Sequence, residues 1–338
     1  MAQKRLGKQT IVFQNPPSII ATATIVGPKE GDGPLKDYFD LILDDDLWGE
    51  SSWEKTEAKL QQEAVKLALT NAKKVTTDVD YLFAGDLLNQ IISSSYAARE
   101  LKIPFFGLYG ACSTKTESLS LGAMAIDGGF ADIVVCVTSS HFSTAERQYR
   151  FPLEHGNQRP LTAQWTVTGA GASVLSSSGN GPYITHVTTG RIIDPGIVNA
   201  NNMGPAMAPA AADTIIRHFK DTGFKPEDYD LIITGDLATV GKEIAQELMA
   251  KEGYDISNIF MDCGIEIFDA ERQDTHAGGS GCGCSAVVFA GYLYKALKAG
   301  KYKRIMLVST GALLSPTIVQ QGESIPGIAH AVTISTEK

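Results

Sequence analysis

The chain has 338 residues, of which 43% are hydrophobic and 20% are charged, a composition that supports a globular protein with a sizeable buried core. Its formal net charge of −9 argues against a general nucleic-acid-binding protein, because contact with phosphates requires a basic surface. We expect no signal peptide and no transmembrane segment, since every apolar run is shorter than the roughly 18 residues that cross a membrane.

A weak internal repeat organises the predicted elements along the chain. The stretch "DYLFAGDLL" at 80–88 resembles "DLIITGDLA" at 230–238, and each combines a strand-like apolar run with Gly-Asp-Leu. In both copies a helical pattern and a second strand follow, after which Cys112 and Cys263 stand at nearly matching positions. The repeat predicts two similar halves, 1–177 and 178–338, that form one integrated unit.

The order of elements predicts the fold class. Each half opens with a strand-like run, "PPSIIATATIVG" in the first and "GPYITHVTTGRI" in the second. Later strands in the two halves follow helical patterns that end near Gly128 and Gly300, and glycine commonly terminates helices. Alternating strands and helices with short loops indicate an α/β fold with mostly parallel sheets covered by helices.

Cys112 lies at a junction between the apolar run "IPFFGLYG" and a helical pattern. Thr114 and Glu117 fit a capping box, so we expect the helix to begin here and its dipole to favour a thiolate. Gly110 and Ala111 are small enough to let a ligand approach. Three interpretations stay open for Cys112: a nucleophile, a part of a binding site, or an inert buried thiol.

The segment after the strand "DIVVCV" is rich in basic and aromatic side chains. It runs from 139 to 160 and contains His141, Arg147, Arg150 and Arg159. Arginine side chains can bind carboxylates, whereas most surface arginines are only solvated. His141 stands at a strand end, where a histidine of the core is the competing interpretation.

A glycine-rich loop, "HAGGSGCGC", begins at His276 and includes Gly279. The next strand ends at Ser309, Thr310 and Gly311. Such loops can build oxyanion holes, and a cysteine with a distant histidine is the usual pair for thiol chemistry. The five cysteines form an odd set without secretory context, which indicates reduced thiols, and the C-x-C spacing with no second pair argues against zinc.

The two halves, "YGACST" and "HAGGSG" together resemble the thiolase superfamily, which includes the 3-oxoacyl-(acyl-carrier-protein) synthases. The resemblance implies a layered αβαβα fold in which Cys112 would be acylated and His276 would activate it. Two departures are evident. Ser309 stands where thiolases carry a second cysteine, and Gly235 and Asp236 replace the His or Asn motif of condensing enzymes. Without that group a Claisen condensation lacks the stabiliser of its carbanion.

The stretches "GDLLNQI", "YGACSTKTESL", "RFPLEHGNQRP" and "TAQWTVTGAGASVL" resemble the stage V sporulation protein AD family over the full chain. This resemblance implies binding of dipicolinic acid (pyridine-2,6-dicarboxylate) or its calcium chelate, for uptake into the developing spore and release at germination. It also implies a peripheral place at the spore inner membrane, beside other stage V sporulation A-group membrane proteins. No cofactor and no metal site of the protein's own are expected, and the superfamily is commonly dimeric.

The predicted ligand site joins two groups of residues. The pocket floor comprises Cys112, His276, Gly279, Ser309, Thr310 and Gly311, and the segment above it contributes His141, Arg147 and Arg150. In the leading interpretation none of these residues is catalytic. The alternatives are an active acyltransferase of the synthase type, with a thioester on Cys112 and His276 as its base, and a purely structural partner of membrane proteins.

Overall fold

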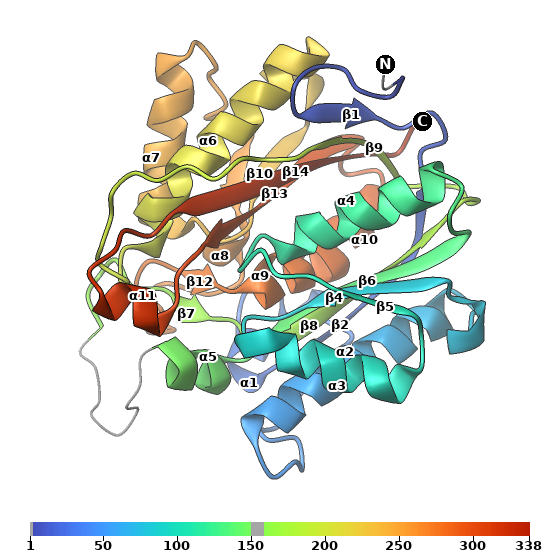
Figure 1. Ribbon diagram of the computed structural model, residues 1–338, viewed down its shortest axis with the longest axis horizontal. Helices are drawn as coiled ribbons and strands as arrows, with labels where there is room; N and C mark the ends of the chain where they lie inside the picture. Colours follow the sequence, from blue (N-terminus) through green and yellow to red (C-terminus); the bar gives the residue numbers. More distant parts are fainter. Residues whose placement is uncertain (1–2, 150–158) are drawn as a thin grey trace.

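The computed structural model of the protein describes residues 3–149 and 159–338 and arranges them in five alternating layers of helix and sheet (Figure 1). The outer helices of the first half are α2 (Trp53–Asn71) and α3 (Ile92–Leu101), and those of the second half are α6 (Met203–Thr222) and α7 (Ala238–Lys251). The central layer holds α4 (Thr114–Asp127), α9 (Cys282–Val287), the π-helical segment η6 (Val288–Leu293) and α10 (Tyr294–Lys298).

Each half contributes five strands to the main path of the sheet, and two further short strands pair at its side. In the first half the order is β5 (Phe105–Gly107), β4 (Tyr81–Gly85), β6 (Ile133–Ser140), β8 (Gly169–Ser176) and β2 (Ser18–Val26). In the second half it is β11 (Phe260–Asp262), β10 (Leu231–Thr234), β13 (Arg304–Ala312), β14 (Gly327–Ser335) and β9 (Tyr183–Thr188). The two sets meet where Ser18 pairs with Tyr183.

The strand directions repeat between the halves. The outer three strands, β5-β4-β6 and β11-β10-β13, are parallel, whereas β8 and β14 run antiparallel to both of their neighbours. The same strand order, with the same directions, occurs twice in one chain. The α/β fold class with two pseudo-symmetric halves is therefore confirmed, and the predicted boundary at 177 and 178 falls between β8 and β9.

Short elements complete the fold. The remaining strands are β1 (Thr10–Val12), β3 (Leu41–Ile42), β7 (Trp165–Thr166) and β12 (Gly279–Ser280), the last two paired in parallel. The remaining α-helices are α1 (Pro28–Gly31), α5 (Phe142–Tyr149), α8 (Cys263–Glu266) and α11 (Pro316–Gln320). Single 3-10 turns are η1 (Lys36–Tyr38), η2 (Thr76–Asp78), η3 (Asn89–Ile91) and η5 (Pro226–Asp228). Within the described residues, no helix combines the length and apolar character needed to cross a membrane.

The central helices are packed so tightly that the sheet must supply small residues. A Cβ atom on Gly171 of β8 would lie 2.3 Å from the carbonyl oxygen of Ala286, so only glycine at this position lets α9 pack this closely.

Lys115 of α4 is fully buried, and its ammonium donates to Ser173 Oγ at 3.0 Å. Burial lowers the pKa of Lys115 to about 8, because the charged form loses its hydration.

Candidate functional site

A tight turn places Cys112 at the start of α4. Ala111 has a φ of +51°, a left-handed conformation that is uncommon for a residue with a side chain. Ser113 Oγ donates to the Gly110 carbonyl at 2.6 Å, and Thr114 Oγ1 donates to the Ala111 carbonyl at 2.7 Å. The helix begins at Thr114, as predicted, but the predicted capping box is wrong, because the Thr114 hydroxyl braces this turn and no side chain caps the helix.

Cys112 lines a small pocket between the two halves. Cys112 is only 8% exposed, and the pocket has a volume of about 50 Å³. The other lining residues are Leu87, Ala111, Ala145, Glu146, Tyr149, Thr166, Ala200, Met203, Ser280, Ala312 and Leu314. Sites for small molecules usually measure several hundred Å³. The pocket beside the thiol is therefore too narrow to hold an aromatic acid without movement of its walls.

Asp236 is a buried acid that contacts two residues of the pocket lining, Ser280 and Cys112. Its carboxylate accepts hydrogen bonds from Thr310 Oγ1 at 2.7 Å, from the Gly281 amide at 3.0 Å and from Ser280 Oγ at 3.1 Å. The Cys112 thiol donates a further hydrogen bond to it. Burial raises the pKa of Asp236, while these donors act in the opposite direction. The four donors fill the acceptor positions of one carboxylate.

The surroundings of Cys112 disfavour a thiolate. Burial, followed by the charge of Asp236, raises the pKa of the Cys112 thiol well above its usual value. A nucleophilic cysteine needs the opposite, a nearby cation or an activating base. Among the described residues that line the pocket there is no histidine. The pocket can bind a ligand through its shape and through hydrogen bonds, but its side chains disfavour deprotonation of Cys112.

His276 and Ser309 form contacts outside the pocket lining. The two ring nitrogens of His276 contact the Pro160 carbonyl and the Asp274 carboxylate, each at 2.9 Å. Ser309 is fully buried, and its hydroxyl lies 2.9 Å from that of Ser285. Neither side chain is among the described residues that line the Cys112 pocket.

Three other predicted floor residues lie close to Cys112 or next to its pocket. Thr310 meets the thiol through Asp236, which both side chains contact. Gly311 lies against the turn that holds Cys112, because a Cβ atom there would be 2.4 Å from the Gly110 carbonyl oxygen. Gly279 precedes the lining residue Ser280 on β12. The structure thus brings Thr310 and Gly311 together with Cys112, and the ligand-binding roles of all these residues stay predictions.

His141 belongs to a buried network that connects β6 with a loop of the first half. Its Nε2 donates to the Asp46 carbonyl at 2.8 Å, and its Nδ1 accepts from the Ser143 amide at 3.1 Å. Burial lowers the pKa of His141, so the neutral ring is favoured. Both nitrogens have partners, which matches the interpretation of a core histidine.

Arg147 lies at an outer cavity that adjoins the Cys112 pocket. This cavity has a volume of about 370 Å³ and shares Tyr149, Ala200 and Leu314 with the pocket beneath it. The Arg147 guanidinium pairs with Glu54 and lies 5.5 Å from the centre of the Trp53 ring. Its five donors exceed what one carboxylate can use. Arg150, also predicted to contact the ligand, lies outside the described residues.

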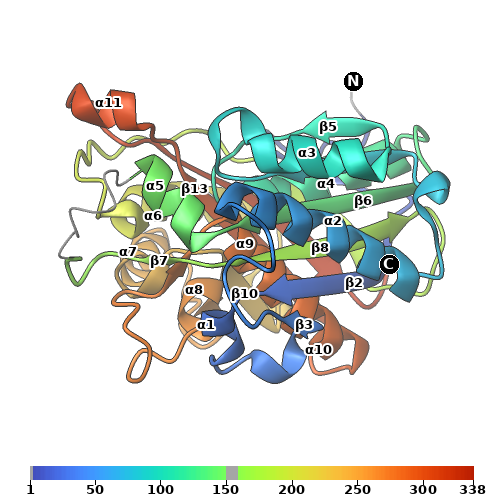
Figure 2. The same ribbon diagram turned by 90° about the horizontal axis from the view of Figure 1, so that it is seen from below.

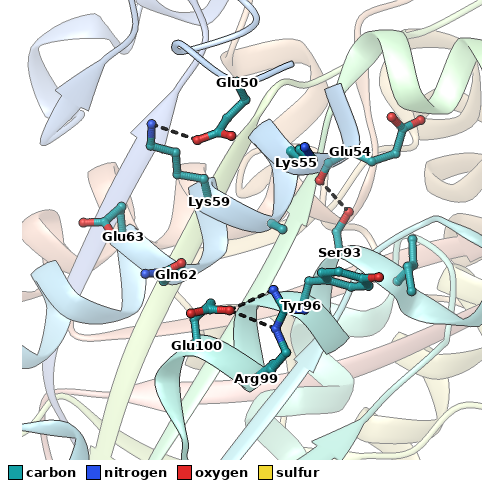
Figure 3. A pocket seen from close by; sticks show the side chains of 12 residues that line it. Glu50, Glu54, Lys55, Lys59, Gln62, Glu63, Ser93, Tyr96, Arg99 and Glu100 are labelled. Atoms are coloured by element: carbon teal, nitrogen blue, oxygen red, sulfur yellow. Dashed lines mark hydrogen bonds and ion pairs between the residues drawn. The ribbon is translucent and has the colours of Figure 1, made fainter. Parts of the chain in front are cut away.

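A larger open groove lies elsewhere, on the outer face between α2 and α3 (Figure 3). Its volume is about 700 Å³, and it shares no lining residue with the Cys112 pocket. Charged side chains in it neutralise one another, because Lys59 pairs with Glu50 at 3.2 Å and Arg99 pairs with Glu100 at 2.8 Å. A self-neutralised surface of this kind is a poor receptor for a small dianion.

The sequence singles out Asp236 but does not predict its role. It predicts Asp236 only as the replacement for a catalytic group of condensing enzymes, whereas the side chain contacts Cys112 directly. The signal in the sequence is an acidic residue at the end of an apolar strand, at the place of that group. No sequence motif marks Tyr149 and Met203 as lining residues of the pocket, because only the tertiary fold brings α5 and α6 close to Cys112.

The fold is thiolase-like, as a comparison with solved structures shows. A 3-oxoacyl-(acyl-carrier-protein) synthase III from Aquifex aeolicus VF5 superposes with a TM-score of 0.59 at 17% identity, covering 94% of this chain and 99% of that one. An OleA variant from Xanthomonas campestris gives a TM-score of 0.62 at 14% identity, covering 96% and 99%. At these identities the likeness concerns the fold alone.

Comparison with protein families classifies the chain more narrowly than the fold does. The family profile of stage V sporulation protein AD matches residues 7–335. The stage V sporulation protein AD of Bacillus subtilis (strain 168) is 48% identical over 329 residues, which cover 97% of each chain. The chain therefore belongs to the stage V sporulation protein AD family, as its motifs predicted, and has a role in sporulation.

Proposed function

We propose that the protein binds dipicolinic acid, alone or as its calcium chelate, in the outer cavity above Cys112 and does not carry out a condensation. Family membership supports the sporulation setting. The observation that carries the proposal is the contact between Asp236 and the Cys112 thiol, which favours the neutral thiol at the pocket floor. A pocket whose cysteine stays neutral can then serve for binding.

The outer cavity suits a flat aromatic dianion better than the narrow pocket beneath it. Its volume of about 370 Å³ lies within the usual range for small-molecule sites. Arg147 offers a guanidinium at its wall, and Tyr149 offers an aromatic ring between cavity and pocket. The donors of the floor are already bound to Asp236, so we place the carboxylates of the ligand nearer to Arg147.

We further propose that binding serves uptake into the developing spore and release at germination, at the spore inner membrane with the A-group membrane proteins as partners. Membership of the sporulation family supports this setting. Co-purification of the protein with these partners from sporulating cells is the expected result. Recovery of the protein without any of them, from membranes solubilised in a mild detergent, would contradict the partnership.

Calorimetric titration with dipicolinate, with and without calcium, tests the binding. We expect saturable binding that weakens about tenfold in Arg147→Met, because a charge-assisted bond to a carboxylate is lost. Arg99→Met is the matched control. Arg99 also pairs with a glutamate and also lies over an aromatic ring, but it lines the groove between α2 and α3. Absence of binding to the unmodified protein would overturn the proposal for the isolated chain.

A second measurement separates binding from the acyltransferase alternative. Incubation with an acyl-CoA and intact-mass analysis should leave Cys112 unmodified, because its thiol is buried and faces a carboxylate. A mass increase that disappears in Cys112→Ala would instead show a thioester. Cys282→Ala is the control, since this cysteine is also buried but is not among the residues that line the pocket.

A further inference from the structure

A second polar cluster lies on β7, on the opposite side of the strand from the Cys112 pocket. Thr166 lines the pocket, whereas its neighbour Trp165 stacks on Phe142 with ring centres 3.7 Å apart. Successive strand residues point to opposite faces, so the two side chains belong to different sites. The elements α1, β7 and α5 meet on this side of the molecule (Figure 2).

Two cations lie over the ring of Trp165. Lys29 Nζ is 4.0 Å from the ring centre, and the Arg159 guanidinium carbon is 4.9 Å from it. Each cation–π contact is favourable, but the two charges repel one another, and this repulsion adds to burial in lowering the pKa of Lys29. Two like charges on one ring indicate that something else stabilises them.

The acidic groups nearby do not neutralise the two positive charges of Lys29 and Arg159. Arg159 Nη2 pairs with Asp274 at 2.7 Å, but Asp274 is 75% exposed and also contacts His276. Glu30 is buried and accepts from the Thr168 amide, and burial raises its pKa to about 8, so its neutral form prevails at pH 7. The cluster of Lys29, Arg159 and Asp274 therefore carries one net positive charge.

Two donors in this cluster have no acceptor among the described residues, a buried one on Arg159 and one on the half-buried Lys29. Arg159 Nη1 is buried and has no hydrogen-bond partner among the described residues, in a side chain that is 17% exposed. Lys29 Nζ likewise makes no hydrogen bond or ion pair with the described part of the chain, and its contact is the ring of Trp165. A buried guanidinium nitrogen without an acceptor is costly, and an anion shared with the ammonium would satisfy both groups.

We propose that Lys29 and Arg159, held over Trp165, form a second anion-binding site that takes one carboxylate or phosphate group of a small soluble molecule. One oxygen of the anion binds the Lys29 ammonium and another binds Arg159 Nη1. A single negative charge matches the net charge of the cluster. The site is separate from the outer cavity and does not depend on the proposed function.

Trp165 provides the readout. In a Trp48→Phe/Trp53→Phe background it is the sole tryptophan, so its emission reports on the cluster. Sodium phosphate and sodium acetate are titrated separately at pH 7 and constant ionic strength, with sodium chloride as the reference. We expect a saturable change with at least one oxyanion, and the tighter of the two identifies a phosphate or a carboxylate as the preferred group. Dipicolinate is omitted, because its carboxylates could occupy both sites.

Substitutions decide whether the cluster is responsible. Lys29→Gln and Arg159→Gln should each weaken the effect about tenfold, and Arg159→Lys should restore part of it, because a lysine keeps the charge but loses the planar fork. Lys251→Gln is the control, since Lys251 is 72% exposed on α7. If Arg159→Gln unfolds, as seen by circular dichroism, Lys29→Gln alone decides. An equal response to chloride, or a response unchanged in Lys29→Gln, would overturn the site.

Discussion

The two Gly-Asp-Leu segments of the repeat place an aspartate at the end of the corresponding strand in each half. Asp86 follows β4 and accepts from the Ser94 amide at 2.8 Å, the Ser94 hydroxyl at 2.6 Å and the Leu88 amide at 2.8 Å. All of these donors belong to the first half. Asp236 follows β10 but also reaches across to Cys112 of the other half. The aspartate of this segment is thus bonded within its own half in one copy and contacts a pocket residue of the other half in the second copy, while Leu87 of the first copy lines the pocket.

The cysteines near the starts of the central helices also differ in their surroundings between the two halves. In the central layer Cys112 lies two residues before α4, and Cys282 opens α9. Asp236 is hydrogen-bonded to the first, and Asp86 is the leading charge acting on the second. Cys282 is fully buried and donates to the Ser139 carbonyl at 2.9 Å, whereas Cys112 lines the pocket. Each of these two pairs joins an acid of one half to a cysteine of the other, and of the two cysteines Cys112 is the one among the residues that line the described pocket.

The largest effect is expected from removal of the Asp236 carboxylate. Asp236→Ala leaves Thr310, Ser280 and the Gly281 amide without their acceptor, which should lower the free energy of unfolding by about 3 kcal/mol. Urea denaturation measures this value. Thr310→Val removes a single donor and should cost only about 1 kcal/mol. An Asp236→Ala protein as stable as the unmodified one would mean that the network is not formed in solution.

A smaller effect concerns pH and the acids of the first half. Burial, followed by the charge of Asp86, raises the pKa of Glu57 to about 8. A carboxyl group with a raised folded-state pKa binds more protons when folded, so it stabilises most below its ordinary pKa, and this contribution is lost as pH rises to about 8. The contribution of Glu57 to the free energy of unfolding should therefore fall between about pH 4.5 and pH 8.

Glu57→Gln sharpens this test, because glutamine keeps the shape and does not titrate. We expect the decrease between pH 5 and pH 8 to become smaller by about 2 kcal/mol, measured by urea denaturation at several pH values. The decrease should persist in part, because burial also raises the pKa of Asp262 in the second half to about 7 and that of Glu30 to about 8. An identical profile in Glu57→Gln would show that Glu57 is ionised in the folded protein.

The two aspartates can also be compared through the reactivity of Cys112. Asp236→Asn removes the charge beside the thiol and should increase the rate of alkylation by iodoacetamide about tenfold, which corresponds to one pKa unit. Asp86→Asn should leave the rate of Cys112 unchanged, because Asp86 is bound within its own half. Peptide mass mapping over a time course measures both rates. Equal acceleration in the two variants would point to general loosening of the fold.

The sequence predicted what depends on local pattern and order. The strand and helix order, the duplicated halves and the start of α4 at Thr114 all follow from apolar periodicity and glycine positions. The repeat also aligned Cys112 with Cys263, whereas Cys263 opens the short helix α8 and Cys282 heads the central helix. The second half inserts α8 and β12 at this point, and equal spacing in a repeat cannot reveal such an insertion.

What the sequence could not predict depends on contacts between distant segments. Cys112 and Asp236 are 124 positions apart, and no local pattern states that an aspartate will accept a hydrogen bond from that thiol. The helix dipole at α4 alone predicts a lowered thiol pKa, yet burial and the neighbouring carboxylate reverse the sign. The orientation of His276 toward Asp274 and Pro160 likewise depends on the packing of its loop.

The smallest effect on stability is expected at Arg99 in the outer groove. Arg99 resembles Arg147 in its contacts: it pairs with Glu100 at 2.8 Å, and its guanidinium lies 4.6 Å from the ring centre of Tyr96. The pair is exposed, so Arg99→Met should change the free energy of unfolding by less than about 0.5 kcal/mol in urea denaturation. Dipicolinate affinity should also stay unchanged.

The comparison of the two arginines then separates position from charge. Both substitutions remove one positive charge from a chain with a net charge of −9, so any general electrostatic attraction of the dianion falls equally in both. Only Arg147 lines the cavity above Cys112. A loss of affinity in Arg147→Met alone therefore locates the ligand in that cavity, whereas equal losses would assign the effect to overall charge and remove the argument for the cavity.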